Sequence, residues 1–124
     1  MRRGMPIETF QDLIVWQKAH VLTISVYKLT ATFPQDERFG LISQMRRAAV
    51  SVPANIAEGF KKRGKADKAN FYNISQGSLA ELQYYFILSK DLGYLADNLG
   101  VIAATDEIGK MLNSLISTIK ASLQ

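Results

Sequence analysis

Cysteine is absent from this 124-residue sequence, and histidine occurs once, as His20. Without cysteine the chain forms neither a disulfide nor a thiolate metal site, and one histidine cannot supply a histidine metal cluster. We interpret His20 as a surface or partly buried residue on a helix. The sequence therefore predicts no metal centre and no bound cofactor.

Long uncharged apolar runs are missing too, since no stretch of about 18 such residues occurs that would cross a bilayer. The opening is basic like that of a signal peptide, but Glu8, Asp12 and Lys18 interrupt the segment that would have to be apolar. We therefore expect no membrane contact and a cytoplasmic location. Three prolines and 48% hydrophobic residues argue against disorder, so we predict a single domain, residues 1–124, with an N-terminal tail at 1–9.

What the chain does contain is apolar residues at helical spacing, beginning with a helix from Phe10 to about Thr32. Phe33-Pro34 ends this helix because the residue before a proline is pushed out of the α region. One apolar stripe is predicted to face the core, and a second set lies off that stripe, which predicts burial on a second side. The first stripe comprises Phe10, Leu13, Ile14, Trp16, Val21, Ile24 and Tyr27, and the second comprises Val15, Leu22, Val26 and Leu29.

A second helix is expected to begin between positions 36 and 39, with Asp36 as its N-cap, and to stop at Gly64. A polar stripe on one side of it would hydrogen-bond to a neighbouring helix or subunit. The predicted core face is Leu41, Met45, Ala48, Val52 and Ile56, and the polar stripe is Gln44, Arg47, Ser51, Asn55 and Glu58.

Pro53 falls inside this second helix and must remove one backbone hydrogen bond. We expect a kink near Pro53 in which the carbonyl near Ala49 lacks its usual partner. The alternative is a break, with Ser51 capping a new helix. The small residues around this position would allow another helix to approach closely.

The third helix is expected from Lys65 to Leu92-Gly93, and the fourth from the turn at Asp97-Asn98 to near Leu123. The run of apolar residues at 84–88 wraps more than a full turn, so some of these side chains should meet a second subunit. Four helices with short turns predict an all-α, antiparallel, up-down-up-down four-helix bundle that is oligomeric. Inward positions are Phe71, Ile74, Ser75, Ser78, Leu79, Leu82, Tyr85 and Phe86, then Val101, Thr105, Ile108, Leu112, Leu115 and Ile119.

Positive charge is concentrated in residues 44–68, which hold seven Lys and Arg against two acidic residues, so this stretch carries +5 and the rest of the chain −1. Five of the cations fall at the junction of the second and third helices, where side chains and helix amides would meet phosphate oxygens. The alternative is a solvated turn that terminates a helix and keeps the bundle soluble. The candidate nucleic-acid-binding residues are Lys61, Lys62, Arg63, Lys65 and Lys68.

Catalytic constellations are not recognisable. EGFKKRGKAD contains glycines and lysines but lacks the order and the preceding strand of a phosphate-binding loop. Glu58 and Glu81 are the best acidic candidates, yet Arg46 and Arg47 are their helical neighbours, which favours structural ion pairs over acid–base work. We therefore predict that the protein is not an enzyme.

Three motifs follow one another at specific spacing: QxRRA at 44–48, NIAEG at 55–59 and GSxxE at 77–81. With them the chain resembles the 23S rRNA-intervening sequence protein family, also called four-helix bundle or S23 ribosomal proteins, over nearly its whole length. The motif residues that we expect to form a structural polar network are Gln44, Arg46, Arg47, Ser51, Asn55, Glu58 and Glu81. Further matching positions include Phe10, Leu13, Trp16, Ala19, Phe33-Pro34, Glu37, Gly40-Leu41 and Leu92-Gly93-Tyr94.

The resemblance implies a bacterial four-helix bundle that assembles as a homopentamer and is encoded in many cases within an insertion in a ribosomal RNA gene. It supplies no catalytic residues. A similar bundle is the accessory protein of diversity-generating retroelements, where a basic pentamer engages a reverse transcriptase and nucleic acid. That second likeness is one of architecture, and architecture does not settle function.

Two functional hypotheses follow. The first is a non-catalytic oligomer that binds RNA or DNA through the basic turn, with several copies adding avidity. The second is a protein-interaction scaffold, or an accessory subunit for a nucleic-acid enzyme such as a reverse transcriptase, without direct nucleic-acid binding. An enzyme is the least supported reading because no group of residues meets the criteria for a catalytic site.

Overall fold

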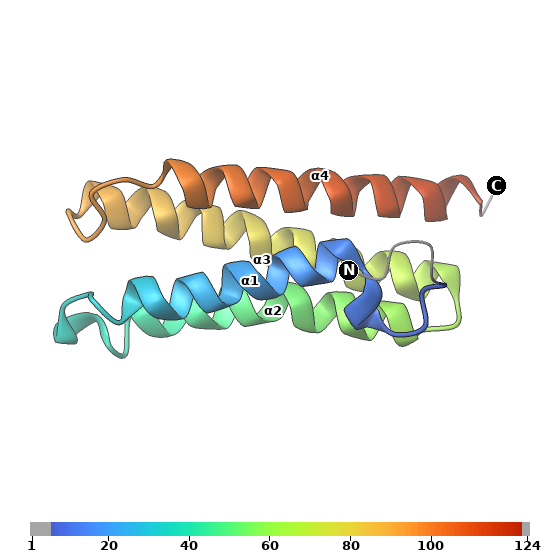
Figure 1. The fold of residues 1–124 in the computed structure, drawn as a ribbon, viewed down its shortest axis with the longest axis horizontal. Helices are drawn as coiled ribbons and strands as arrows, with labels where there is room; N and C mark the ends of the chain where they lie inside the picture. The colour runs from blue at the N-terminus through green and yellow to red at the C-terminus, as the bar shows by residue number, and fades with distance from the viewer. Residues whose placement is uncertain (1–5, 123–124) are drawn as a thin grey trace.

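A computed structural model describes residues 6–122 of the chain, which form four long α-helices connected by short turns (Figure 1). Successive helices run antiparallel, and no strand occurs between residues 6 and 122. The predicted all-α, up-down-up-down arrangement is therefore observed. The helices are α1 Ile14–Thr30, α2 Leu41–Lys61, α3 Lys65–Asp91 and α4 Leu99–Ala121, with 3-10 turns at Phe10–Asp12 and Gln35–Glu37.

The first helix starts later than its apolar pattern predicted. Leu13 has extended backbone angles, so the 3-10 turn before it is separate from α1. The Asp12 carboxylate holds this turn by accepting backbone N–H groups of Glu8 and Thr9, both at 3.0 Å. Residues 1–5 of the predicted tail lie outside the described residues. The helix ends at Thr30, two residues before the predicted end at about Thr32 and shortly before Phe33-Pro34.

The predicted inward stripe of α1 is wrong. Val21 is 62% exposed and Ile24 is also exposed, whereas the set predicted for a second side faces the core. Both stripes have helical spacing, and hydrophobicity alone ranked the wrong one first. The deciding residues are Ala19, whose small side chain allows close approach, and Thr30, whose hydroxyl donates to the Val26 carbonyl at 2.7 Å and is thereby buried without an orphan donor. The buried residues of α1 are Val15, Ala19, Leu22, Val26 and Thr30.

The second helix buries the predicted face, but both of its ends differ from the prediction. Asp36 is not the N-cap: the helix begins after Gly40, and the Glu37 carboxylate accepts the Leu41 backbone N–H at 3.3 Å. The 3-10 turn at Gln35–Glu37 places the Glu37 side chain beside the first turn of the helix. The helix ends at Lys61, three residues before Gly64.

Pro53 sits within an unbroken α2, which excludes the predicted alternative of a break capped by Ser51. Because proline has no N–H, the Ala49 carbonyl one turn earlier loses its intrahelical donor. The Thr23 hydroxyl of α1 lies 3.0 Å from this carbonyl and 2.8 Å from its own Ala19 carbonyl. The proline thus creates an acceptor that α1 satisfies, while a kink of α2 at Pro53 stays a prediction.

The third and fourth helices begin and end close to the predicted positions. Tyr72 is buried although it was not predicted to face the core, and Ile74, predicted to face inward, is 42% exposed. The Ser75 hydroxyl donates to the Val52 carbonyl at 2.8 Å, which joins α3 to α2. The buried positions of α4 are Thr105, Ile108, Leu112 and Ile116, of which the first three belong to the predicted seam. The other seam positions, Val101, Leu115 and Ile119, are only partly buried, and the predicted end near Leu123 lies outside the described residues.

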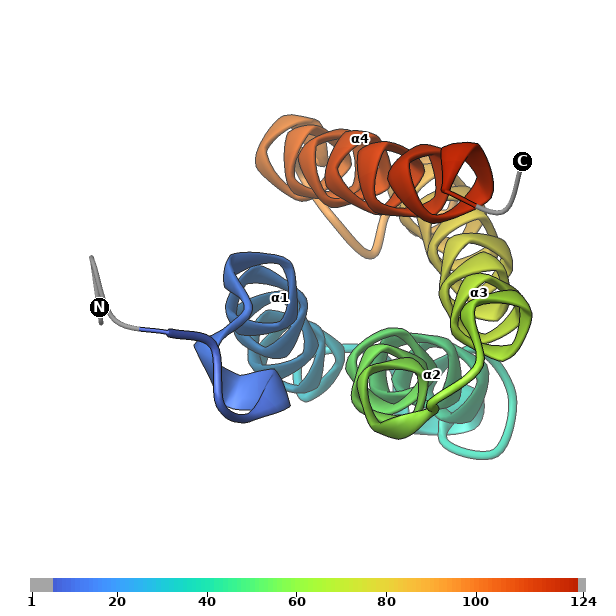
Figure 2. The same ribbon diagram turned by 90° about the vertical axis from the view of Figure 1, so that its right-hand side faces the viewer.

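Seen along its length, the bundle places the helices around the core in the order α1, α2, α3, α4 (Figure 2). Helices α2 and α3 make the most extensive contact, and α1 and α4 pack more sparsely. A hollow of about 630 Å³ lies between α1 and α4, and an ion pair of 3.2 Å between Lys18 and Glu107 crosses from one helix to the other. At one end, the Tyr94 hydroxyl donates to the Glu37 carboxylate at 2.9 Å, which connects the two turns there.

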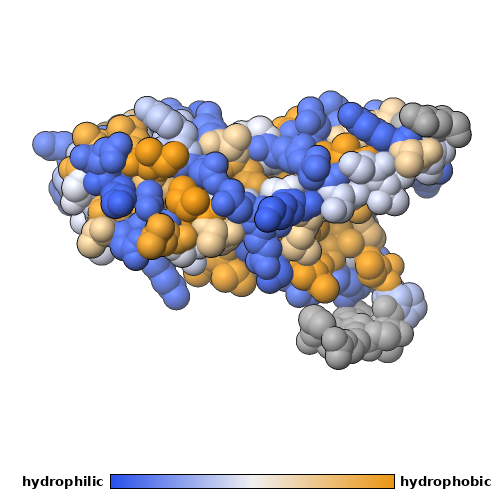
Figure 3. All heavy atoms as spheres, turned by 90° about the horizontal axis from the view of Figure 1, so that it is seen from above, coloured by the Kyte–Doolittle hydropathy of each residue, from blue (hydrophilic) through white to orange (hydrophobic). Residues whose placement is uncertain are grey.

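Exposed apolar residues occur on all four helices. On α1 they include Ile14, Val21 and Ile24, of which the first two line the hollow beside α4. On α3 they are Ile74, Tyr84 and Ile87. Apolar side chains also lie among charged ones on the face formed by α4 and α1 (Figure 3). Across residues 6–122, no helix is both long and apolar enough to cross a bilayer.

Candidate nucleic-acid interface

The basic turn joins α2 to α3 and is shaped by a close approach of the two helices. A Cβ atom on Gly59 would lie 2.7 Å from Cε1 of Tyr72 and 3.2 Å from the Phe71 Cβ, so only glycine fits there without a shift. Lys62 leaves the helix with extended backbone angles, and its N–H donates to the Gly59 carbonyl at 3.2 Å. Gly64, predicted to stop α2, instead precedes α3 as its N-cap, with a negative φ of −75°.

Two of the five predicted binding cations have partners within the chain. The Lys68 ammonium donates to the carbonyls of Gly59 at 3.2 Å and Phe60 at 2.7 Å. It therefore neutralises the negative end of α2, where carbonyls have no helical partner. The Lys62 ammonium lies 4.0 Å from the Glu58 carboxylate and 5.0 Å from the centre of the Phe71 ring.

The other three cations, Lys61, Arg63 and Lys65, are exposed. Between residues 6 and 122 none of them forms an ion pair or a side-chain hydrogen bond. They are brought together on either side of the α3 N-terminus, whose first turn has no side-chain cap. The positive end of the helix dipole thus lies beside three free cations, an arrangement that attracts anions, with the Asp67 carboxylate in the same first turn.

The predicted ion pairs of the motif residues are not found. Glu58 pairs with Lys62, and within the described part of the chain neither Arg46 nor Arg47 forms an ion pair with Glu58 or Glu81. Arg46 points toward α1 instead: its Nε donates to the Thr30 hydroxyl at 2.9 Å, and its guanidinium lies 4.6 Å from the centre of the Tyr27 ring.

Arg47 and Glu81 are exposed on neighbouring helices and act on the same tyrosine. Burial raises the pKa of Tyr85, the Glu81 charge raises it further and the Arg47 charge lowers it. The sequence analysis predicted ion pairs because it took Arg46 and Arg47 as helical neighbours of Glu58 and Glu81, whereas Glu58 pairs with Lys62 one turn along the chain.

The middle of the predicted polar stripe does join α2 to α3. The hydroxyls of Ser51 and Ser78 are 2.7 Å apart, and the Asn55 amide donates to the Ser51 hydroxyl at 3.0 Å. Gln44, at one end of the stripe, is exposed. The hydrogen bonds among these serines and asparagine serve packing, as predicted for the small and polar residues of this helix.

A surface that sequence reasoning missed lies at the opposite end of α2. A hollow of about 550 Å³ there is lined by arginines, aromatic and aliphatic side chains. Phe39 is 89% exposed, and the Arg38 guanidinium lies 5.6 Å from the centre of its ring. The available signal was an Arg-Phe pair placed about two helical turns before Arg46 and Arg47. Its lining residues are Tyr27, Arg38, Phe39, Ile42, Ser43, Arg46, Arg47 and Val50.

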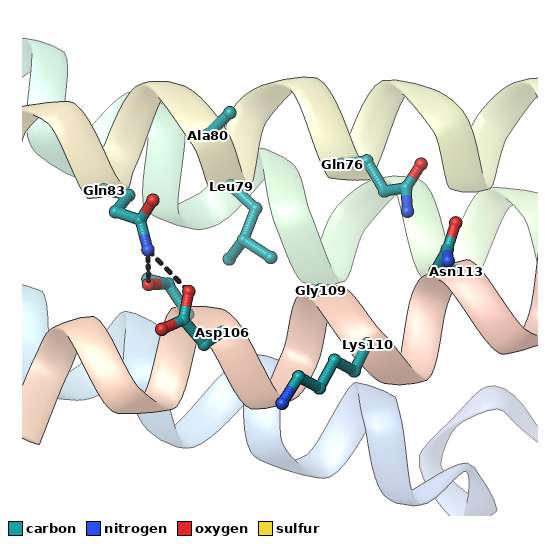
Figure 4. Close-up of a pocket in the computed structure, with 9 residues that line it drawn as sticks. Gln76, Leu79, Ala80, Gln83, Asp106, Gly109, Lys110 and Asn113 are labelled. Carbon is teal, nitrogen blue, oxygen red and sulfur yellow. Dashed lines mark hydrogen bonds between the residues drawn. The ribbon is translucent and has the colours of Figure 1, made fainter.

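A polar groove of about 400 Å³ runs between α3 and α4 (Figure 4). The Gln83 amide donates to the Thr105 hydroxyl and to the Asp106 carboxylate, both at 2.9 Å, and Asn113 lies opposite Gln76. The groove offers amides, one carboxylate and one ammonium but no paired nucleophile and base. Among the described residues no three His, Asp or Glu side chains gather to hold a metal ion.

Comparison with known proteins identifies the family. Residues 11–114 match the family model described as 23S rRNA-intervening sequence protein. A crystal structure of a protein of unknown function from the S23 ribosomal protein family of Bacteroides thetaiotaomicron superposes with a TM-score of 0.77 at 24% sequence identity, covering 84% of this chain and 96% of that one. No curated protein matches the sequence significantly. The crystal structure supports the fold, and the match over 11–114 shows that the chain belongs to the 23S rRNA-intervening sequence protein family.

Proposed function

We propose that this protein is a non-catalytic, oligomeric four-helix bundle that acts in the cytoplasm and binds RNA or DNA through Lys61, Arg63 and Lys65. The proposal rests on a difference between the engaged and the free cations of the basic turn. Lys62 and Lys68 are engaged by the fold, whereas these three cations are exposed and free of partners beside an uncapped helix N-terminus. Three unpartnered cations contribute nothing to the packing of the bundle, so their clustering favours a phosphate partner.

One such cluster binds weakly, because each phosphate contact contributes mainly through the release of counterions. Several copies on one assembly would bind a long strand more tightly by avidity. Exposed apolar residues on α1 and α3 support self-association. The two helices lie on different sides of the core, separated by α2 on one side and by α4 on the other (Figure 2).

Two different apolar faces favour a head-to-tail contact, in which α1 of one copy meets α3 of the next. Such contacts close into a ring if the rotation between copies permits it. A homopentamer of the kind implied by the family resemblance is one such ring. We include it in the proposal, with light scattering as the measurement of its mass.

The binding experiment compares three proteins in a fluorescence anisotropy titration with labelled single-stranded RNA and duplex DNA. The test variant is Lys61→Ala/Arg63→Ala/Lys65→Ala, and the matched control removes three exposed lysines elsewhere, Lys90→Ala/Lys110→Ala/Lys120→Ala. We expect the test variant to lose at least tenfold in affinity at low salt and the control to lose much less. Equal losses in both variants would show that net charge alone acts and would refute the assignment to the turn.

The second candidate function is a scaffold for a protein partner, such as a nucleic-acid enzyme. The exposed stripe of Ile74, Tyr84 and Ile87 on α3 favours it, because aromatic and aliphatic side chains are typical of contact surfaces. A complex that survives nuclease treatment, and that the triple variant of the turn forms as well as the wild type, would support the scaffold over direct nucleic-acid binding.

A further inference from the structure

The hollow at the start of α2, which the sequence did not predict, supports a further inference. We call it the Arg–aromatic surface and define it by Arg38, Phe39, Arg46 and Arg47, with Tyr27 beneath Arg46. It lies where α2 begins, whereas the basic turn lies where α2 ends (Figure 1). At 1.5 Å per residue, the 14 residues from Arg47 to Lys61 separate the two by about 20 Å along α2. The two cationic regions are therefore distinct.

Arg46 is held in a fixed position. Its Nε donates to the Thr30 hydroxyl at 2.9 Å, one terminal nitrogen donates to the Tyr27 carbonyl at 3.3 Å, and the Tyr27 ring covers one face of the guanidinium. A guanidinium has five N–H groups, so about three remain for a ligand. Fixing the group in advance reduces the entropy that a ligand must overcome on binding.

Phe39 has no role in the core of its own chain. At 89% exposure it is the most exposed of the large apolar side chains between residues 6 and 122. Burying such a ring would stabilise the fold, a gain that this chain forgoes. The ring lies beside Arg38, whose guanidinium is 5.6 Å from its centre, and it presents a flat π surface to solvent.

Charge decides the class of ligand. No carboxylate lines the hollow, although three arginines do. The nearby Glu37 carboxylate is already used by the Tyr94 hydroxyl and the Leu41 N–H. An anionic partner is therefore favoured, and the exposed aromatic ring requires one that also offers a flat face. Nucleic acid offers both, but a duplex keeps its base faces stacked inside, so only a single strand presents them.

We infer that the Arg–aromatic surface binds single-stranded nucleic acid, with a base stacked on Phe39 and phosphates contacted by Arg38, Arg46 and Arg47. This rests on the proposed function, that the protein binds nucleic acid, and adds that the ligand is single-stranded and has a second contact site. The basic turn supplies charge alone and accepts any phosphate backbone. The Arg–aromatic surface distinguishes strands that have accessible bases from those that do not.

The test is an anisotropy titration of the full chain with three labelled probes: a single-stranded oligonucleotide, an abasic strand of equal phosphate number, and a duplex. Phe39→Ala should weaken binding of the single strand by roughly five- to a hundredfold, the usual effect of one lost stacking contact, and leave the abasic strand unchanged. Phe39→Trp should restore binding. Leu99→Ala, which removes another exposed apolar side chain at the start of α4, is the matched control.

A charge variant tests the phosphate contacts separately. Arg38→Gln/Arg47→Gln should weaken binding of the single strand and of the abasic strand alike, and should do so more than Lys110→Gln/Lys120→Gln. Arg46 is left intact because its bonds to Thr30 and Tyr27 also join α2 to α1.

Several outcomes overturn the inference. Equal effects of Phe39→Ala and Leu99→Ala would remove the stacking role, and a poly-glutamate peptide that competes as well as RNA would make the surface a site for acidic protein. A change in sedimentation coefficient with Phe39→Ala would make it a contact between copies of this chain. If these variants bind normally while the triple variant of the basic turn does not, the inference fails and the proposed function stands. If the wild type binds no probe, the proposed function itself fails.

Discussion

Replacing Thr23 by valine isolates the hydrogen bond that compensates for Pro53. The substitution keeps the shape of the side chain but removes the hydroxyl that lies 3.0 Å from the Ala49 carbonyl. Ala49 is 1% exposed, so water cannot take over the acceptor. Leaving a buried acceptor without a donor costs about 1–3 kcal/mol, and each kcal/mol lowers the Tm of a chain of this size by roughly 4 °C. We expect Thr23→Val to lower Tm by roughly 4–12 °C.

The control is Thr118→Val. The Thr118 hydroxyl donates to the Ser114 carbonyl at 2.9 Å, a bond within its own helix like that from Thr23 to Ala19, but it has no acceptor on another helix. Thermal unfolding is followed by circular dichroism at one fixed protein concentration, because self-association would shift Tm. We expect Thr118→Val to lower Tm by less than half as much.

A double-mutant cycle then tests the cause. Pro53→Ala provides a backbone N–H at position 53 for the Ala49 carbonyl, so the cost of Thr23→Val should fall by at least about 1 kcal/mol in that background. If Thr23→Val costs the same with and without Pro53, or no more than Thr118→Val, the compensation that we describe does not occur.

Three other predictions concern the turns. Gly59→Ala should lower the free energy of unfolding by about 1–2 kcal/mol in urea titrations, since a Cβ would lie 2.7 Å from Tyr72 and overpacking outweighs the gain in helix propensity. Lys68→Met should lower it by about 1 kcal/mol while Lys65→Met leaves it nearly unchanged, because only Lys68 donates to α2 carbonyls. The hydrogen bond to the Glu37 carboxylate raises the pKa of Tyr94 above its ordinary value. The contribution of this hydrogen bond to folding stability is therefore complete below the ordinary pKa and is lost as the pH rises past the raised pKa. Absorbance at alkaline pH should show late titration of Tyr72, Tyr85 and Tyr94, whose pKa values are all raised, and Tyr94→Phe should remove one of the three.

The number and direction of the helices follow from periodicity, because apolar spacing and helix-stopping residues act locally, but the ends of α1 and α2 do not. Periodicity also does not decide which apolar stripe of a helix is buried. In α1 the choice depended on Ala19 and Thr30, and neither scores as strongly hydrophobic. The small side chain of Ala19 allows α1 to approach α2 closely. The hydrogen bond to the Val26 carbonyl offsets the cost of burying the Thr30 hydroxyl. Both are properties of the packed pair of helices.

The candidate site shows the same division. Counting charges located the basic turn, yet only the fold shows that Lys68 reaches back to α2 and that Lys62 pairs with Glu58. The Arg–aromatic surface was harder to predict from the sequence, because Phe39 resembles an ordinary apolar residue that anchors a turn to the core. Its 89% exposure, which appears only after folding, distinguishes it from one.

The slope of binding affinity against salt tests the central claim most directly. Each phosphate contact on a single strand contributes about 0.7 to the slope of log K against log salt concentration, so three free cations contribute about 2. We predict that Lys61→Ala/Arg63→Ala/Lys65→Ala reduces the slope by about 2 for each copy engaged, while Lys90→Ala/Lys110→Ala/Lys120→Ala leaves it almost unchanged. Identical slopes for the wild type and the turn variant would contradict the account, as would a wild type that binds neither RNA nor DNA at low salt.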